Sequence, residues 1–184
     1  MDLPDGYPTE FERAIALRDG TRVRIRPILP EDEPRLMALH SRLSRDTRYQ
    51  RFFSAIQRLP PDWAHFFANV DYHRRLALVA ERSSTGGPEL IGVARYEGTD
   101  QEDTVEVAFV IEDPWQNRGL GTILLHELLR AAEGRGIRRF RAYVLPDNER
   151  MLHLLSRHTH ILQRKTEQGL ADILFTYRES KADP

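Results

Sequence analysis

Val105-Glu106-Val107-Ala108-Phe109-Val110-Ile111 is the first of two neighbouring segments that indicate the fold. After a short connection, the second is Gln116-Asn117-Arg118-Gly119-Leu120-Gly121-Thr122. The first segment is a compact run rich in β-branched residues and predicts a strand. The second opens Leu120–Glu133, whose apolar residues Ile123, Leu124, Leu128 and Ala131 share one helical face. Gly134 and Gly136 end this predicted helix. The sequence therefore predicts a strand, a short loop with two close glycines and an apolar helix.

A helix that begins at two glycines is suited to holding an anion. Its first four backbone N–H groups lack partners within the helix, and its dipole adds partial positive charge. Gly119 and Gly121 have no Cβ atoms, so a pyrophosphate can approach their backbone closely. Arg118 adds a cation and the Thr122 hydroxyl another donor. For the two glycines alone, the alternative is a tight strand-to-helix turn without a ligand.

Two other phosphate-binding motifs fail at this position. The P-loop requires a lysine after its second glycine, and none stands near. The dinucleotide-binding fingerprint requires a third glycine where Leu124 stands, and an acidic residue at the end of the next strand, where Leu145 stands. The anion site is therefore of another kind.

The rest of the chain predicts an α/β (mixed α+β) fold, with a central, mixed, largely antiparallel sheet and helices on both faces. Asp19-Gly20 indicates a hairpin turn between two extended segments, and Ser83–Pro88 indicates a second turn. The expected strands are Phe11–Arg18, Thr21–Ile28, Arg75–Glu81, Leu90–Tyr96, Val105–Ile111, Arg139–Leu145, Ile161–Arg164 and Ile173–Tyr177. The expected helices are one opening at Pro30-Glu31-Asp32-Glu33, then Arg45–Phe53, Pro61–Asn69, Leu120–Glu133 and Asn148–Arg157.

Length and composition limit the domain organisation. We expect a flexible arm over 1–10, one domain over 11–178 and a tail over 179–184 of the 184 residues. The absence of cysteine excludes disulfides, thiolate metal ligands and a cysteine acyl-enzyme. A net charge of −1 gives no general reason to bind nucleic acid or a membrane. No run reaches the roughly 20 apolar residues of a membrane helix, and we expect a cytoplasmic protein.

The central stretch resembles the acyl-CoA motif of the GNAT superfamily of N-acyltransferases, [QR]-x-x-G-x-[GA], at Gln116, Gly119 and Gly121. The resemblance runs from about Thr21 to Tyr177 and implies a GNAT fold that binds acetyl-CoA as acyl donor, without a metal. It implies that backbone groups of Phe109, Val110 and Ile111 hold the pantetheine arm, with Asn148 contacting the donor as well. The implied donor-binding residues are Phe109, Val110, Ile111, Gln116, Asn117, Arg118, Gly119, Leu120, Gly121, Thr122 and Asn148.

A narrower resemblance lies in the first third of the chain. Val23–Ile28, Pro30–Pro34 and Arg51-Phe52-Phe53 are similar to segments of bacterial protein-lysine acetyltransferases, which modify acyl-CoA synthetases. The resemblance implies a protein lysine as acceptor, with an acyl-CoA synthetase as the expected partner. It leaves the acceptor, the acyl-chain length, the oligomeric state and any regulation by another chain undetermined.

Glu106 is the candidate general base. An amine acceptor arrives as an ammonium and must lose a proton before it attacks a thioester. Strand alternation places Glu106 with Ala108 and Val110, opposite Val107 and Phe109. Partial burial there is expected to raise its pKa. The alternative is a solvated acid at the strand end, paired with an arginine. The resemblance supports the base, because the lysine acetyltransferases use a glutamate at this position.

The sequence favours direct acetyl transfer to an amine in a ternary complex, and leaves two alternatives. A small amine can replace the protein lysine as acceptor, or the domain can bind acyl-CoA without catalysis. Many GNAT enzymes have a tyrosine acid where Leu155 stands, but a thiolate is already a good leaving group. His153, His158 and His160 lie close in sequence, although helix and strand periodicities are expected to scatter them. We therefore expect no metal site.

Overall fold

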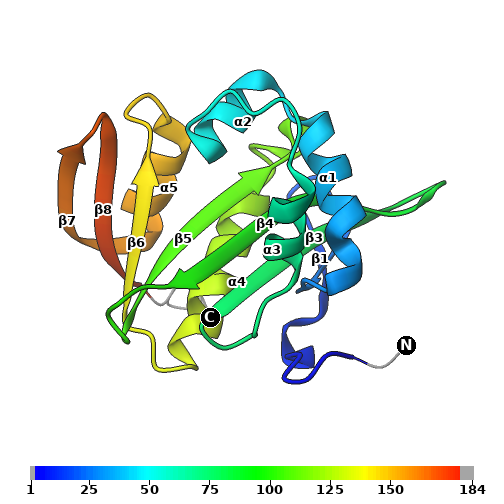
Figure 1. Ribbon diagram of the computed structural model, residues 1–184, viewed down its shortest axis with the longest axis horizontal. Helices are drawn as coiled ribbons and strands as arrows, with labels where there is room; N and C mark the ends of the chain where they lie inside the picture. Colours follow the sequence, from blue (N-terminus) through cyan, green and yellow to red (C-terminus); the bar gives the residue numbers. More distant parts are fainter. Residues whose placement is uncertain (1–2, 179–184) are drawn as a thin grey trace.

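The computed structural model describes residues 3–178, which form one mixed sheet between two layers of helices (Figure 1). The strand order in the described residues is β1-β2-β3-β4-β5-β6-β8-β7, and only the β5–β6 pair is parallel. The strands are β1 (Arg13–Ala16), β2 (Arg22–Pro27), β3 (Arg75–Ser84), β4 (Gly87–Gly98), β5 (Thr104–Ile111), β6 (Arg139–Val144), β7 (Thr159–Glu167) and β8 (Leu170–Tyr177). This arrangement confirms the predicted fold class.

The helices pack on opposite faces of the sheet and bury two apolar clusters. They are α1 (Glu33–Arg42), α2 (Arg45–Phe52), α3 (Pro61–Ala68), α4 (Leu120–Glu133) and α5 (Glu149–His158), with short 3-10 turns η1 (Thr9–Phe11), η2 (Pro30–Asp32) and η3 (Asp113–Trp115). Apolar residues of α4 and α5 pack against one face, and those of α1 and α3 against the other. Leu124 and Leu128 of α4 are almost completely buried, as its apolar stripe predicted.

The sheet opens between β5 and β6, and this opening positions the site. The two strands pair only from Thr104 to Glu106, opposite Arg139 to Arg141, and then diverge (Figure 1). Beyond that point β6 pairs only with β8, while β5 stays paired with β4 as far as Ile111. The edge of β5 that faces β6 therefore has no partner strand over residues 107–111. Apart from the Ile111 carbonyl, which accepts from the Gln116 side chain, the backbone N–H and C=O groups on that edge have no strand partner in the described residues and are available to a ligand.

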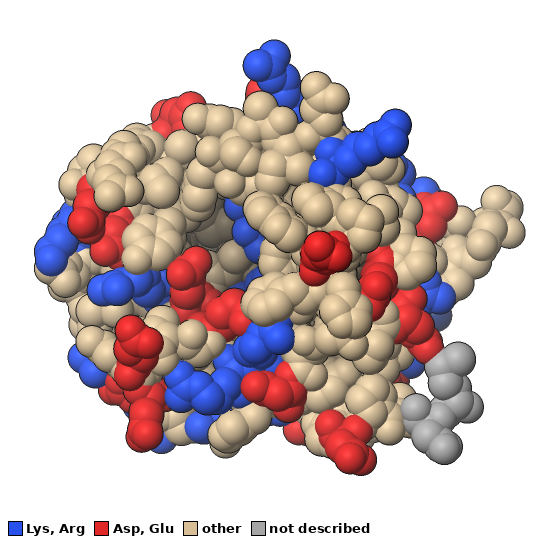
Figure 2. Space-filling model, viewed as in Figure 1, with Lys and Arg blue, Asp and Glu red and all other residues tan. Residues whose placement is uncertain are grey.

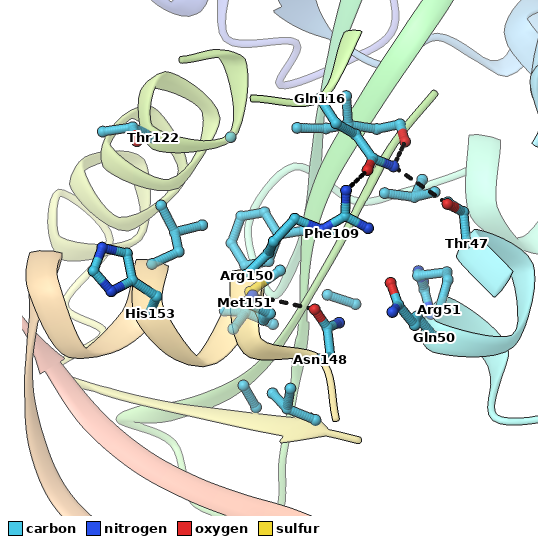
Figure 3. Close-up of a pocket in the computed structure, with 18 of the residues that line it drawn as sticks. Thr47, Gln50, Arg51, Phe109, Gln116, Thr122, Asn148, Arg150, Met151 and His153 are labelled. Atoms are coloured by element: carbon cyan, nitrogen blue, oxygen red, sulfur yellow. Dashed lines mark hydrogen bonds between the residues drawn. The ribbon is translucent and has the colours of Figure 1, made fainter. Parts of the chain in front are cut away.

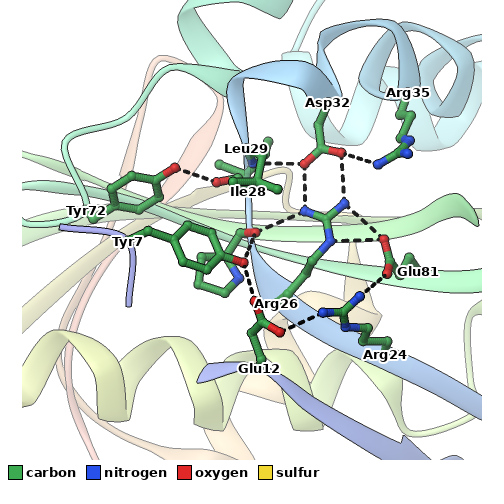
Figure 4. Close-up of polar contacts among 11 residues, drawn as sticks. Tyr7, Glu12, Arg24, Arg26, Ile28, Leu29, Asp32, Arg35, Tyr72 and Glu81 are labelled. Atoms are coloured by element: carbon green, nitrogen blue, oxygen red, sulfur yellow. Dashed lines mark hydrogen bonds and ion pairs between the residues drawn. The ribbon is translucent and has the colours of Figure 1, made fainter. Parts of the chain in front are cut away.

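A buried polar network joins the front hairpin to the first helical segment (Figure 4). The Arg26 guanidinium donates to both carboxylate oxygens of Asp32, at 2.7 and 2.8 Å, and to Glu81 at 3.0 Å. Asp32 also accepts from the Leu29 N–H and from Arg35. Arg26 and Asp32 are buried, so the network fixes β2 against η2 and β3 with its charges compensated.

The N-terminal arm and the turn between β3 and β4 differ from what the sequence predicted. The arm expected to be flexible over 1–10 is held at Tyr7, which is buried, contacts the Tyr72 ring and donates to Glu12 at 2.9 Å. The turn expected over Ser83–Pro88 is shorter, because β3 and β4 continue to Ser84 and Gly87. The expected tail over 179–184 lies outside the described residues.

Candidate active site

A cavity of about 550 Å³ occupies the opening between β5 and β6. It is lined by β5, the start of α4, the α5 helix and α2, together with part of β6. Figure 2 shows it as a hollow on the face in view, with acidic and basic side chains around its rim. Figure 3 shows Gln50 and Arg51 of α2 on one side of it, and Thr122 and His153 on the other. Four elements far apart in sequence therefore meet at one cavity.

The start of α4 has the backbone geometry that an anion site at this position requires. Gly119 is the N-cap with φ of 90°, a backbone conformation that favours glycine, and it offers no capping side chain. A Cβ atom on Gly121 would lie 3.3 Å from Ile111 Cδ1 and 3.8 Å from Leu154 Cδ2. One on Gly119 would lie 3.3 Å from Arg18 Nε. Both glycines line the cavity, so the unpaired N–H groups of this helix start are accessible to a phosphate.

The Gln116 side chain holds the loop before α4. Its Nε2 donates to the Ile111 carbonyl at 2.9 Å and to the Thr47 hydroxyl at 3.2 Å, and its Oε1 accepts from Arg150 (Figure 3). The amide thereby links β5, α2 and α5 around the cavity. Asn117, with φ of 61°, follows it at the cavity wall.

Arg118 and Leu120 are motif residues whose side chains do not line the cavity. The Arg118 guanidinium donates to Asp19 at 2.7 Å and lies over the Trp115 ring, 4.4 Å from its centroid. Leu120 is completely buried in the core. The Arg118 side chain therefore holds the β1–β2 turn. At this position of the motif, only the backbone groups of Arg118 remain for a ligand.

Asn148 begins α5 and faces the cavity. Its Oδ1 caps the helix by accepting from the Met151 N–H at 3.2 Å (Figure 3). The residue lines the cavity together with Phe109, Val110, Ile111 and Thr122. Capping uses the side-chain oxygen, which leaves the amide NH₂ as a donor for a ligand.

Glu106 lies on β5, is exposed, and lines the cavity together with Arg51 of α2. Within the described residues, no side chain ion-pairs or hydrogen-bonds with its carboxylate. The surrounding protein raises the pKa of Glu106 above its ordinary value, because desolvation outweighs the opposing charge of Arg51. Glu97 also raises this pKa, whereas Arg141 lowers it. A carboxylate with a raised pKa, free of partners, can accept a proton near neutral pH.

The other acids near this strand are occupied. Glu112 is buried and accepts from Arg42 at 2.8 Å. Arg42 belongs to α1, which the sequence alone did not place beside the end of β5. Asp103 accepts from Arg139 at 2.9 Å.

Several residues at the cavity were missed from the sequence. Arg18, Thr47, Gln50, Arg150 and Arg157 line it and were not singled out from the sequence, whereas Arg51, Phe53, His153 and His158 were quoted but not expected at the cavity. Amphipathic periodicity placed most of their helices but gave no register between α2 and β5. The sequence predicted that His153, His158 and His160 are scattered. Nδ1 of His158 lies 3.2 Å from Nε2 of a different histidine, His126 on α4. No cluster of metal-ligating side chains occurs within residues 3–178.

At this cavity, the unpaired edge of β5 meets the glycine-rich start of α4 in the described part of the chain. Residues 37–159 match the model of the Acetyltransferase (GNAT) family. The chain belongs to this family. GNAT acetyltransferases use acetyl-CoA as donor.

Two curated relatives and one solved structure are similar to the chain. An acetyltransferase of Pseudomonas aeruginosa is 33% identical over 67% of this chain and 66% of its own length. Acetyltransferase Pat of Mycolicibacterium smegmatis is 31% identical over 78% of this chain and 42% of its own length. The GNAT domain of S. lividans PAT is 35% identical, with a TM-score of 0.83 over 92% of this chain and 99% of that domain. The chain thus spans less than two thirds of the length of both curated relatives.

Helix length bears on membrane insertion. Within the described residues, no helix is long and apolar enough to cross a membrane.

Proposed function

We propose that the protein transfers an acetyl group from acetyl-CoA directly to the side-chain amine of a lysine in another protein, with Glu106 as general base. The observation that carries this proposal is the Glu106 carboxylate, which is free of partners, has a raised pKa and lies on the same strand as the open edge. A small amine acceptor is the alternative left by the sequence.

The donor is proposed to lie along β5 with its pyrophosphate at the start of α4. The fit rests on the two glycine positions, where a Cβ atom would intrude, and on the helix N–H groups that open to the cavity. Backbone groups of Phe109, Val110 and Ile111 are proposed to hold the pantetheine arm, and the Asn148 amide to donate to it. Acetyl-CoA supplies the acetyl thioester at the Glu106 end of the cavity.

Glu106 is proposed to act on the incoming amine. It accepts a proton from the ammonium, and the neutral nitrogen attacks the thioester carbonyl. The new C–N bond forms, the C–S bond breaks, and the nitrogen gives its second proton to the departing thiolate, which leaves as the free thiol of CoA. Backbone N–H groups near Val110 stabilise the developing oxyanion. Positioning both substrates in one ternary complex supplies most of the remaining rate enhancement. Leu155 is buried, so the side chain at that position supplies no acid to the thiolate.

The lysine acceptor is supported by the likeness to Pat and PAT acetyltransferases and by the access route. Glu106 stands at a hollow that opens on the molecular surface, where a long, flexible amine can enter (Figure 2). We also propose a cytoplasmic location and an acyl-CoA synthetase as the protein partner, both from the resemblance to bacterial lysine acetyltransferases.

The test is Glu106→Gln, assayed by mass spectrometry on candidate synthetases incubated with acetyl-CoA. The amide keeps the shape but cannot accept a proton, so turnover should fall by about 10²- to 10⁴-fold while acetyl-CoA binding persists. Because the pKa of Glu106 is raised, wild-type kcat/KM should fall with decreasing pH through that pKa, and the mutant should lose this acid limb. Glu102→Gln, at an exposed position outside the cavity, is the matched control. Near-normal turnover in Glu106→Gln would make Glu106 structural.

A further inference from the structure

A second, smaller cavity adjoins the active-site cavity behind β5. It measures about 40 Å³ and lies between the sheet and the layer formed by α1, α2 and α3. Arg51, Ala108 and Val110 line both cavities. The side chains of Ala108 and Val110 thus separate the donor groove from the inner cavity. The space exceeds the roughly 10–15 Å³ that one water molecule needs.

The inner cavity contains buried polar atoms without partners. His40 is 3% exposed, and neither of its ring nitrogens has a hydrogen-bond partner among the residues that the structure describes. Arg95 is 4% exposed and its Nε also has no partner, although its other nitrogens donate to Glu97 and to the Phe67 carbonyl. Buried polar groups in native proteins are almost always hydrogen-bonded. Two such residues at one cavity therefore point to a polar occupant.

The positive charge of Arg51 favours a negatively charged occupant. Arg51 is partly buried and, within residues 3–178, has neither a hydrogen bond nor an ion pair. Its guanidinium lies over the rings of Phe52 and Phe67, 4.9 and 5.9 Å from their centroids, and the charges of Glu106 and Glu97 act on it without forming an ion pair. Burial, followed by the charge of Arg95, lowers the pKa of Arg51 to about 10, so it stays protonated at neutral pH. Its planar donors match a carboxylate.

The position of these groups identifies the source of the anion. Ala108 and Val110 lie on the strand proposed above to hold the thioester end of the donor. A group beyond the thioester carbonyl would enter the inner cavity, whereas the acceptor amine approaches from the open hollow near Glu106. The acyl portion of the donor is therefore the part of a substrate that can reach His40, Arg51 and Arg95.

We propose that the inner cavity binds the terminal carboxylate of a short dicarboxylic acyl group, so that the enzyme transfers such groups as well as acetyl. This inference rests on the donor placement given under Proposed function. Glu106 takes one proton from the ammonium, the neutral nitrogen bonds to the thioester carbonyl carbon, the C–S bond breaks, and the second proton of the nitrogen goes to the departing thiolate. The distal carboxylate stays ionised beside Arg51, and a neutral His40 can donate one N–H to it.

The experiment compares malonyl-CoA with isovaleryl-CoA, a neutral donor of nearly the same shape. Calorimetric titration of the protein alone measures both affinities without an acceptor, so a carboxylate on the acceptor cannot contribute. Malonyl-CoA should bind about 10- to 100-fold more tightly, the worth of a charged hydrogen-bonded contact. Arg51→Met should reduce this ratio to near unity. Arg45→Met, an exposed arginine of α2 outside both cavities, should keep it.

Each outcome decides the inference. Equal or tighter binding of isovaleryl-CoA would show an apolar acyl pocket filled by alkyl chains or water, and would overturn the proposal. An unchanged ratio in Arg51→Met would remove the assigned residue. Since each ratio compares two donors on one protein, a general loss of affinity cancels. Loss of amine transfer in all assays, with the malonyl preference intact, would contradict the proposed acceptor chemistry and leave this inference standing.

Discussion

Arginine has two contrasting environments in this molecule. Arg26 is buried with its charge matched by Asp32 and Glu81, whereas Arg51 lines the active-site cavity without an ion-pair partner in the described residues. Burial without a partner is costly for a charged group, so the first arrangement is stabilising and the second is suited to a ligand. Arginine therefore has a structural role at position 26 and a proposed ligand-binding role at position 51.

Removing the Arg26 charge should destabilise the fold strongly. Arg26→Met keeps the apolar stem but leaves Asp32 and Glu81 as buried carboxylates without their main counter-charge. The free energy of unfolding should fall by about 3–5 kcal/mol in urea titrations. Arg22→Met, at an exposed position on the same strand, should change it by no more than about 0.5 kcal/mol. Equal stabilities for the two variants would contradict this assignment.

The same network predicts how the loss depends on pH. Burial alone would raise the pKa of Asp32, but its hydrogen bonds and the charge of Arg26 outweigh burial and lower it. A lowered folded-state pKa means that the stabilisation is complete above the unfolded value of about 3.9. It is lost as the pH falls through the folded-state pKa. The difference between wild type and Arg26→Met should therefore shrink in acid.

At the scale of elements, the start of α5 combines a structural and a binding role in Asn148. Asn148→Ala should cost about 1 kcal/mol of stability through the lost cap and should also weaken acetyl-CoA binding. Asn148→Ser keeps a capping oxygen but removes the amide donor. The serine variant should therefore unfold like wild type in urea while binding acetyl-CoA more weakly in calorimetry. If serine and wild type bind equally, the amide does not contact the donor.

Local patterns predicted the elements well where one face is clearly apolar. The α4 helix begins and ends at the residues expected, because its stripe of leucines and its terminal glycines mark both boundaries. The β3–β4 hairpin was predicted too short, because an ion pair between Arg82 and Glu89 extends the ladder across polar residues. Such cross-strand pairs form only when two distant positions come into register, which a local window does not detect.

At the scale of the whole molecule, one wall of the cavity was predictable and the other was not. The glycine motif and β5 are adjacent in sequence, so their meeting followed from a single strand–loop–helix unit. The α2 wall, with Gln50 and Arg51, reaches the cavity through the packing of the α1–α3 layer on the sheet. Gln116 looked like a ligand contact, but its amide is bonded to Thr47 and Ile111. Long-range packing decides these contacts, and residue pattern alone does not encode them visibly.

We expect acetyl-CoA to bind at the opening of the sheet, and the Gly121→Val variant tests this expectation. The valine would fill the space beside Ile111 that the donor backbone contact requires. Gly134→Ala, at the far end of α4, controls for changing a glycine of this segment.

The measurement is unfolding of the three proteins with and without acetyl-CoA. At a hundredfold excess over the dissociation constant, wild type and Gly134→Ala should gain about 2.7 kcal/mol by mass action. Gly121→Val should gain nothing. A wild type that acetyl-CoA does not stabilise, or an equal gain in folded Gly121→Val, would contradict the account.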